Sequence, residues 1–279
     1  MPSMTQAEKG RIFRALHERD GAFIIPNPWD VGTARLLAHL GFEALATTSM
    51  GYAFSAGRRD NTLDRRETLE YASAIAAATD LPVSADLENG FGDDPATVAE
   101  TVRLAAAAGV VGGSIEDATG RPEHPIHELE HAAERVRAAT AAARALTFPF
   151  TLTARAENYL HGRPDLKDTI ARLQAYQEAG ADVLYAPALS KKDDIAAVVK
   201  SVDRPVNVVM GLAGVQMSLA ELEAMGVKRV SVGSSLSRTA LGAFLRAARE
   251  MRVHGTFTFA AGAANPKEIT TVFKAWEPR

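Results

Sequence analysis

The sequence contains no cysteine among its 279 residues. This absence excludes disulfide bonds, thiolate metal sites and cysteine nucleophiles. No run of about 18 consecutive apolar residues occurs, so no segment is expected to cross a membrane. The net charge is −3 and the arginine pairs are too short to form a polyanion site, which argues against nucleic acid and membrane surfaces as partners. These features favour a cytoplasmic protein that acts on a small molecule.

Eight short apolar segments recur along the chain and predict strands. Several lack strict polar alternation, which is typical of parallel strands covered on both faces. Helical patterns separate them, and the clearest has Asp94 as its N-cap, Pro95 at its first position and Gly109 after its last turn. The predicted strands span residues 22–25, 44–49, 83–87, 112–117, 151–155, 183–187, 206–210 and 229–233.

Eight strands, each followed by a helix, predict a (β/α)₈ TIM barrel. The alternative is a doubly wound open sheet, but the first predicted strand runs into Pro-Asn-Pro-Trp-Asp rather than into a glycine-rich phosphate loop. No linker divides the chain, so we expect a single domain over 1–279, which begins with an amphipathic helix within residues 1–21. Residues 255–279 are expected to form a C-terminal helical extension, in which Trp276 packs either on its own barrel or on a neighbouring subunit.

Charged side chains follow several of the predicted strands, where a barrel of this type places its catalytic groups. Neighbouring strands lie about 4.8 Å apart, so acids that end adjacent strands face one another. Such a cluster is stabilised by a divalent cation, and ligands that are all carboxylates suit Mg²⁺ or Mn²⁺ rather than zinc. The residues concerned are Asp60, Asp86, Glu88, Glu116, Asp117, Arg155 and Glu157.

Each of these residues also has a purely structural interpretation. An isolated acid after a strand is more often a helix cap or a salt-bridge partner than a metal ligand, and Asp93 and Asp94 are interpreted as caps of the helix that begins at Pro95. Arg155 could form an internal salt bridge with Glu157 or Glu116, or it could bind a substrate carboxylate through two parallel hydrogen bonds. The residues alone leave these alternatives open.

Three segments in this order resemble the isocitrate lyase/phosphoenolpyruvate mutase superfamily: SADLENGFGDDP at 84–95, GGSIEDATG at 112–120 and TARAENYL at 153–160. The opening segment at 27–49 is also similar. The resemblance implies a barrel enzyme that makes or breaks C–C or C–P bonds in 2-oxo or 2-hydroxy acids. It also implies a tetramer in which a C-terminal helix is exchanged between subunits.

The resemblance assigns roles to individual residues. Asp86 is expected to ligate Mg²⁺ directly, and Arg155 to bind a substrate carboxylate. Three further acids are expected to hold the water molecules of the ion, and the loop after the second strand to bind the other carboxylate or oxyanion. The water-holding acids are Asp60, Glu88 and Glu116, and the loop residues are Thr48, Ser49 and Gly51.

The segment after the fourth strand departs from the superfamily pattern. Lyases of the superfamily have a Lys-(Lys/Arg)-Cys-Gly-His motif there, whose cysteine supplies a proton, and the mutases use a lysine. Residues 117–128 contain neither Cys nor Lys. Histidine titrates near neutral pH, so His124 and His127 could replace the missing group, as could Tyr159 or His161, but a structural role, such as that of solvated lid residues, is the preferred interpretation of these residues.

The sequence therefore predicts a Mg²⁺-dependent lyase or decarboxylase that acts on a small 2-oxo or 2-hydroxy dicarboxylate, such as oxaloacetate or an alkylmalate. The expected intermediate is a metal-stabilised enolate. We expect catalytic roles for Arg155, Glu116, His124 and Tyr159. The alternatives are a C–P mutase or hydrolase and a ligand-binding barrel without turnover. A dimer or tetramer is expected in each case.

Overall fold

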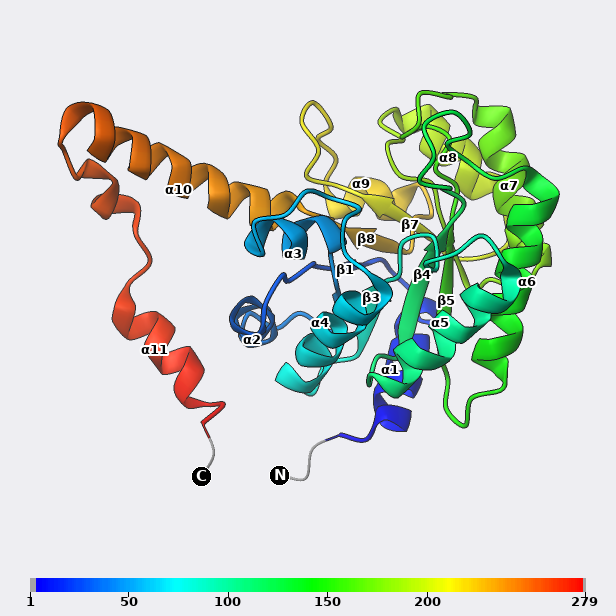
Figure 1. The fold of residues 1–279 in the computed structure, drawn as a ribbon, viewed down its shortest axis with the longest axis horizontal. Coiled ribbons are helices and arrows are strands. Elements are labelled where there is room, and N and C mark those ends of the chain that lie inside the picture. Colours follow the sequence, from blue (N-terminus) through cyan, green and yellow to red (C-terminus); the bar gives the residue numbers. More distant parts are fainter. Residues whose placement is uncertain (1–3, 278–279) are drawn as a thin grey trace.

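The computed structural model describes residues 4–277, in which eight parallel strands form one sheet with the order β1-β8-β7-β6-β5-β4-β3-β2. Beside the remaining edge, the backbone N–H of Ala46 in β2 donates to the carbonyl of Pro26, directly after β1, at 3.1 Å. The sheet is therefore a nearly closed barrel surrounded by helices (Figure 1), and the predicted fold class is confirmed.

All eight predicted strands are present, and most are shorter than predicted because the chain turns away soon after the polar residues begin. The strands are β1 (Phe23–Ile25), β2 (Leu45–Ala46), β3 (Val83–Asp86), β4 (Gly112–Glu116), β5 (Thr151–Arg155), β6 (Val183–Tyr185), β7 (Val206–Val209) and β8 (Arg229–Ser231). The helices that follow them are α2 (Val31–His39), α3 (Ser49–Ser55), α4 (Arg65–Ala78), α5 (Pro95–Ala107), α6 (Leu129–Arg144), α7 (Leu166–Glu178), α8 (Lys192–Lys200), α9 (Leu219–Ala224) and α10 (Ser235–His254).

Capping chemistry sets the start of the helix that follows β3. Asp94 caps α5 through its Oδ1, which accepts from the backbone N–H of Ala96 at 3.0 Å, and Pro95 occupies the first turn as predicted. The expectation that Asp93 shares this capping role was wrong. The Asp93 carboxylate instead forms an ion pair with Arg121 in the segment after β4.

The N-terminal helix α1 (Gln6–Glu18) packs across the N-terminal end of the barrel. Its buried side chains include Phe13 and His17, and the His17 ring meets both the Phe13 ring and the Phe23 ring of β1 edge to face. Close contact with the barrel requires small residues, because a Cβ added to Gly112 would lie 2.7 Å from the Phe13 ring. The amphipathic helix predicted here is confirmed from Gln6, while residues 1–3 lie outside the described part of the chain.

The C-terminal part of the chain leaves the barrel (Figure 1). Helix α10 is long and extends away from the strands, and Ser237 is its single buried residue. A short 3-10 helix (Thr258–Gly262) and α11 (Pro266–Lys274) follow, and α11 contacts α2. The guanidinium of Arg35 lies over the Trp276 ring at 5.7 Å, so Trp276 packs on its own chain. Within residues 4–277 no helix is both long enough and apolar enough to cross a membrane.

Candidate active site

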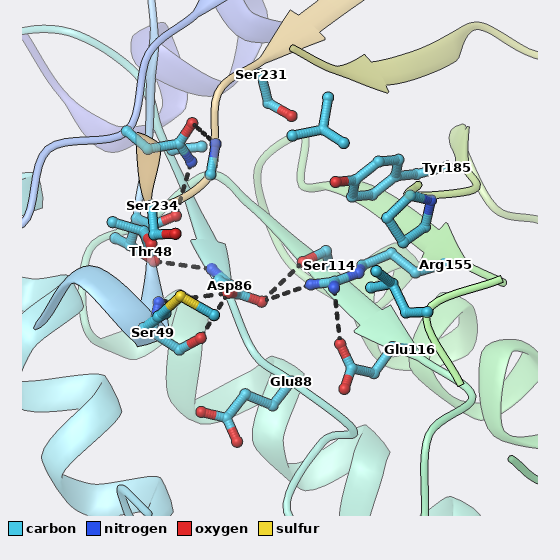
Figure 2. Close-up of a pocket in the computed structure, with 18 of the residues that line it drawn as sticks. Thr48, Ser49, Asp86, Glu88, Ser114, Glu116, Arg155, Tyr185, Ser231 and Ser234 are labelled. Carbon is cyan, nitrogen blue, oxygen red and sulfur yellow. Dashed lines mark hydrogen bonds and ion pairs between the residues drawn. The ribbon is translucent and has the colours of Figure 1, made fainter. Parts of the chain in front are cut away.

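A cavity of about 600 Å³ opens at the C-terminal ends of the strands, and residues from all eight strands line it. The structure brings most of the predicted site residues into this one space (Figure 2). They come from four segments that are far apart in the sequence. The predicted residues that line the cavity are Thr48, Ser49, Asp60, Asp86, Glu88, Glu116, Arg155, Glu157 and His161.

Asp86 ends β3 at the centre of this group (Figure 2). Its Oδ2 accepts a hydrogen bond from Ser49 Oγ at 2.9 Å, and its Oδ1 accepts one from Arg155 Nη1 at 2.9 Å. The Asp86 backbone N–H donates to Thr47 Oγ1 at 2.8 Å, which fixes the strand end against β2. The carboxylate is therefore held in one orientation at the wall of the cavity.

Arg155 ends β5 and forms ion pairs with three carboxylates. Its Nη2 lies 2.8 Å from Glu157 Oε1 and 3.1 Å from Glu116 Oε2, in addition to the contact with Asp86. The guanidinium also lies over the Tyr185 ring, 5.2 Å from its centroid. Both predicted interpretations of Arg155 are thus compatible with its position, since it joins internal salt bridges and lines the cavity at the same time.

The acids around Arg155 outnumber it, and burial makes their charge costly. Burial raises the pKa of Glu116 well above its usual value, although the nearby Arg155 opposes this shift. Burial likewise raises the pKa of Glu157. The pKa of Arg155 is raised because the combined charges of Glu157, Glu116 and Asp86 outweigh its burial. The group therefore has an excess of negative charge that a bound cation would offset.

Asp60 and Glu88 show this excess most clearly. One oxygen of each, Asp60 Oδ1 and Glu88 Oε1, is buried without a hydrogen-bond partner. Burial, reinforced by the charges of Asp86 and Asp60, raises the pKa of Glu88 to about 8, and burial raises the pKa of Asp60. Glu88 also has a left-handed backbone, with φ of 48°, as does Asn61 next to Asp60, with φ of 56°. Strain of this kind is concentrated at functional sites in proteins.

These residues fit a hydrated divalent cation. Among the described residues, no group of three acidic or histidine side chains could hold a metal ion by direct ligation alone. Mg²⁺ keeps several of its water molecules in proteins and is held by one or two carboxylates, so it does not need such a group. The unpartnered oxygens of Asp60 and Glu88 could accept hydrogen bonds from those waters, with Asp86 as the carboxylate that touches the ion.

The segment after β2 differs from the expected loop. Residues 49–55 form helix α3, and Thr48 is its N-cap, with Oγ1 accepting from the Gly51 backbone N–H at 3.2 Å. Thr48 and Ser49 line the cavity, whereas Gly51 packs behind them. A Cβ at Gly51 would lie 2.6 Å from Thr48 Cγ2, so this turn admits only glycine without rearrangement. A short helix therefore presents Thr48 and Ser49 to the cavity.

Asp117 belongs to a separate buried network although it adjoins Glu116. Its Oδ2 accepts from Arg172 Nη1 at 2.9 Å and from the Tyr176 hydroxyl at 2.6 Å. Its Oδ1 accepts from the backbone N–H of Glu157 at 2.8 Å. Asp117 thus fixes the ends of β4 and β5 to α7 and does not face the cavity.

The segment after β4 folds back on itself, with Ala118 and Ile126 forming an antiparallel bridge. His124 and His127 line a separate, smaller hollow on this segment rather than the main cavity. Tyr159 packs against the apolar core instead of lining the cavity. Of the four candidate proton donors, His161 lines the main cavity, together with the adjacent Leu160.

The sequence interpretation did not identify several residues that line the cavity. Tyr185 ends β6 and lies partly buried beside Arg155, and its desolvation raises its pKa. A search of strand ends could have found it, because it is the last residue of its strand. Asn207 and Arg229 lie earlier in β7 and β8, and no rule about strand ends would have identified them.

Comparison with known proteins agrees with this geometry. The sequence profile described as phosphoenolpyruvate phosphomutase matches residues 13–252, which is most of the chain. The protein belongs to this family, within the isocitrate lyase/phosphoenolpyruvate mutase superfamily. It is an enzyme of the lyase or mutase type. It is similar to the Mycobacterium tuberculosis protein Rv1998c, with 31% identity over 85% of this chain and 87% of the relative. It is also similar to an oxaloacetate decarboxylase from Pseudomonas savastanoi, with 28% identity over 90% and 88% of the two chains.

Solved structures extend the comparison. A Burkholderia cenocepacia J2315 protein, provisionally described as a lyase/mutase, is 66% identical, with a TM-score of 0.95 over 96% of this chain and 97% of the other. A phosphonopyruvate hydrolase in complex with oxalate and Mg²⁺ is 28% identical, with a TM-score of 0.85 over 98% and 96% of the two chains. The relatives of this chain thus include an oxaloacetate decarboxylase and a phosphonopyruvate hydrolase.

Proposed function

We propose that the protein is a Mg²⁺-dependent lyase or decarboxylase that acts on a small 2-oxo or 2-hydroxy dicarboxylate of the oxaloacetate or alkylmalate type. One observation supports this most strongly. Asp86 is held between Ser49 and Arg155 while Asp60 and Glu88 place unpartnered oxygens in the same cavity. Surplus negative charge around an oriented carboxylate is the environment that a hard cation requires.

In this proposal Asp86 would ligate the ion, and Asp60, Glu88 and Glu116 would orient its water molecules. A cation bound at Asp86 would polarise the 2-oxo group and stabilise the negative charge that develops when the C–C bond of the substrate breaks. The protein residues fix the geometry beforehand, because the hydrogen bonds of Ser49 and Thr47 hold the end of β3 in place.

Arg155 is proposed to bind a substrate carboxylate. A cation on Asp86 would weaken the Asp86–Arg155 ion pair and leave Nη1 able to donate to a substrate oxygen. Glu116 and Glu157 would still orient the guanidinium through Nε and Nη2. Thr48 and Ser49 lie on the opposite side of Asp86 from Arg155 and are proposed to contact the oxyanion that develops on the substrate (Figure 2).

His161 is the proposed proton donor, because it alone of the four candidates lines the main cavity. A water molecule at the mouth of the cavity is the alternative donor. His161→Gln is therefore expected to slow turnover more than His124→Gln, which alters the smaller hollow. Equal effects of the two variants would remove His161 from the mechanism.

The second candidate function is cleavage or rearrangement of a C–P bond at the same residues. The likeness to a phosphonopyruvate hydrolase that binds oxalate and Mg²⁺ supports it. The absence of lysine from residues 117–128 counts against it, because the mutases use a lysine in this segment.

A panel of substrates separates these functions. The purified protein with Mg²⁺ is incubated with oxaloacetate, alkylmalates and phosphonopyruvate, and both 2-oxo acid products and phosphate are measured. Consumption of oxaloacetate or an alkylmalate that EDTA abolishes and Mg²⁺ restores is the expected result. Phosphate release from phosphonopyruvate would favour the second candidate. Binding of oxalate without turnover of any acid would indicate a ligand-binding barrel.

We also propose that the protein is a homo-oligomer, a tetramer or a dimer, in which α10 is exchanged. Helix α10 has several exposed apolar side chains and extends away from its own barrel. In a (β/α)₈ fold the last helix normally packs against the outside of that barrel, so this position is left uncovered. A second copy would supply an equivalent helix to that position. The exposed apolar residues of α10 are Leu236, Leu241, Phe244, Leu245, Met251 and Val253.

A further inference from the structure

The active-site cavity continues into the barrel below the acids. Residues two apart on a strand share a face, so Ser84 lies beneath Asp86 and Ser114 lies beneath Glu116. Both serines line the cavity, as do Ala46 of β2 and Ser231 of β8. Bulky branched side chains usually fill the interior of such a barrel. The small residues at these positions leave open space inside the barrel, below the residues proposed to hold the metal ion.

Arg229 lies at the inner end of this space. It is the first residue of β8, is 5% exposed and lines the cavity. Its Nε donates to Asn207 Oδ1 at 2.8 Å, and its Nη2 donates to Thr153 Oγ1 at 3.0 Å. Its Nη1 lies 3.3 Å from His17 Nε2. A guanidinium has five N–H groups, so two remain for another acceptor.

None of these partners neutralises the charge of Arg229. The amide and the hydroxyl are neutral, and His17 is neutral as well, because burial and the neighbouring Arg229 lower the pKa of His17 to about 3. Among residues 4–277 no carboxylate forms an ion pair with Arg229, whereas Arg155 has three such partners. A buried cation without a counter-charge is unfavourable, so a bound anion at this point would be stabilised by Arg229.

A further donor lies beside Arg229 (Figure 2 shows Ser231 on the cavity wall). The Asn207 amide donates to Ser231 Oγ at 3.0 Å, so the Ser231 hydroxyl hydrogen is directed toward the neighbouring Tyr185 hydroxyl or into the cavity, where a ligand could accept it. The inner end thus offers one positive charge and several hydrogen-bond donors. A carboxylate with a single charge matches one guanidinium, whereas a phosphate dianion would leave a charge unbalanced.

We propose that Arg229 and Ser231 form an inner subsite for a carboxylate, and that this carboxylate is the distal end of a linear 2-oxo dicarboxylic acid. The proposal rests on the proposed function for the other end of the ligand, since the 2-oxo acid group would lie at Asp86. It adds a determinant of chain length: the substrate reaches down the barrel axis past Ser84 to the guanidinium.

Binding of matched pairs of acids tests the subsite. Calorimetry with Mg²⁺ compares 2-oxoglutarate with 2-oxovalerate and 2-oxoadipate with 2-oxohexanoate, and each pair differs by one terminal carboxylate. The wild-type protein is expected to prefer the dicarboxylate by about tenfold or more in at least one pair, since a charge-assisted hydrogen bond is worth that factor. Arg229→Gln should reduce the preference to about threefold or less. The exposed Arg246→Gln is the control and should retain it.

Oxalate separates this proposal from the proposed function, because it is too short to reach Arg229 from Asp86. If oxalate binds with Mg²⁺ but neither pair shows a preference, or the preference survives in Arg229→Gln, the inner subsite is overturned and the metal site stands. If oxalate does not bind but an Arg229-dependent preference is present, the subsite stands and the proposed function fails. If acetate binds in an Arg229-dependent manner while no dicarboxylate is preferred, the site holds a free anion and the assignment to substrate is overturned.

Loss of folding in Arg229→Gln would be recognised by circular dichroism, and Ser84→Val then provides the decisive measurement. The added methyl groups would narrow the cavity between Asp86 and Arg229 without changing any charge. Ser84→Val is expected to reduce the dicarboxylate preference by about the same factor and to leave oxalate affinity within about twofold. An unchanged preference in this variant would overturn the proposed path to Arg229.

Discussion

Arg155 Nη1 donates to Asp86 Oδ1 at 2.9 Å, which joins the end of β5 to the end of β3 inside the cavity. The register explains how the two residues meet. Asp86 pairs with Ser114 of β4, and Arg155 pairs with Glu116 two residues further along the same strand. Asp86 and Glu116 therefore face Arg155 from successive levels of β3 and β4, and the two residues at the centre of the proposed mechanism are already in contact.

Replacement of Asp86 by Asn should abolish Mg²⁺-dependent turnover. The amide is close in shape but cannot supply a charged oxygen to the ion, so we expect activity to fall by at least about a hundredfold. The melting temperature should change by only a few degrees, because Ser49 and Arg155 retain polar partners. Steady-state kinetics across Mg²⁺ concentrations provide the measurement, and full activity in this variant would end the proposed mechanism.

Replacement of Arg155 by Lys should weaken binding of dicarboxylates. A lysine ammonium cannot form two parallel hydrogen bonds or contact Glu116, Glu157 and a substrate at the same time. We expect the dissociation constant for oxalate with Mg²⁺ to rise by about tenfold or more. Calorimetric titration measures it, and an unchanged constant would remove Arg155 from substrate binding.

Loss of the Arg172 charge should destabilise the fold without altering the ligand site. Arg172→Met would leave Asp117, which is 2% exposed, without its cationic partner. Breaking such a pair from one side costs about 3–5 kcal/mol of the free energy of unfolding. Denaturant titration measures this loss. A matched titration with oxalate should show nearly unchanged affinity where the variant is folded, and a large loss of affinity would mean that Asp117 takes part in binding.

His17 should make the fold sensitive to acid. Burial lowers the pKa of His17 to about 3 in the folded protein, whereas in the unfolded chain it is about 6.5. Between these two pH values the unfolded chain therefore binds a proton at His17 and the folded protein does not. The contribution of neutral His17 to stability is present above pH 6.5 and is lost as the pH falls toward 3. In His17→Gln the free energy of unfolding should therefore fall less steeply over this range. The exposed His254→Gln serves as the control and should follow the wild-type curve.

The apolar face of α10 should control assembly. Phe244 is 66% exposed in the single chain, and Phe244→Asp would place a charge on the proposed contact. We expect the wild-type mass by light scattering to be two or four times the 29.7 kDa of one chain, and that of the variant to be smaller. A wild-type mass equal to one chain would contradict the proposed exchange. Glu250→Gln is the comparison variant. It changes a charge on the same helix but places no charge on the apolar face, so the mass is expected to equal that of the wild type.

Local sequence patterns were enough to place the strands and most helices. Short valine-rich runs such as Val206–Val209 favour buried strands, and Asp94 with Pro95 defines where α5 begins, because both signals depend on neighbours in the chain. The short helix α3 was missed, since residues 49–55 have too few turns to show a periodic pattern. The positions of Asp86, Glu88, Glu116 and Arg155 at strand ends were likewise readable once the barrel was predicted.

The tertiary structure alone decided how these side chains pair. Asp117 and Glu116 are adjacent in sequence, yet one enters a buried network with Arg172 and the other lines the cavity, because successive side chains on a strand point to opposite faces. The place of Arg229 depends on contacts with His17 and Thr153, which are 212 and 76 residues away. Sequence determined which groups were available and near which strand ends they lie. Which charged groups meet inside the barrel is decided only by closure of the sheet, because closure brings residues that are distant in the sequence together.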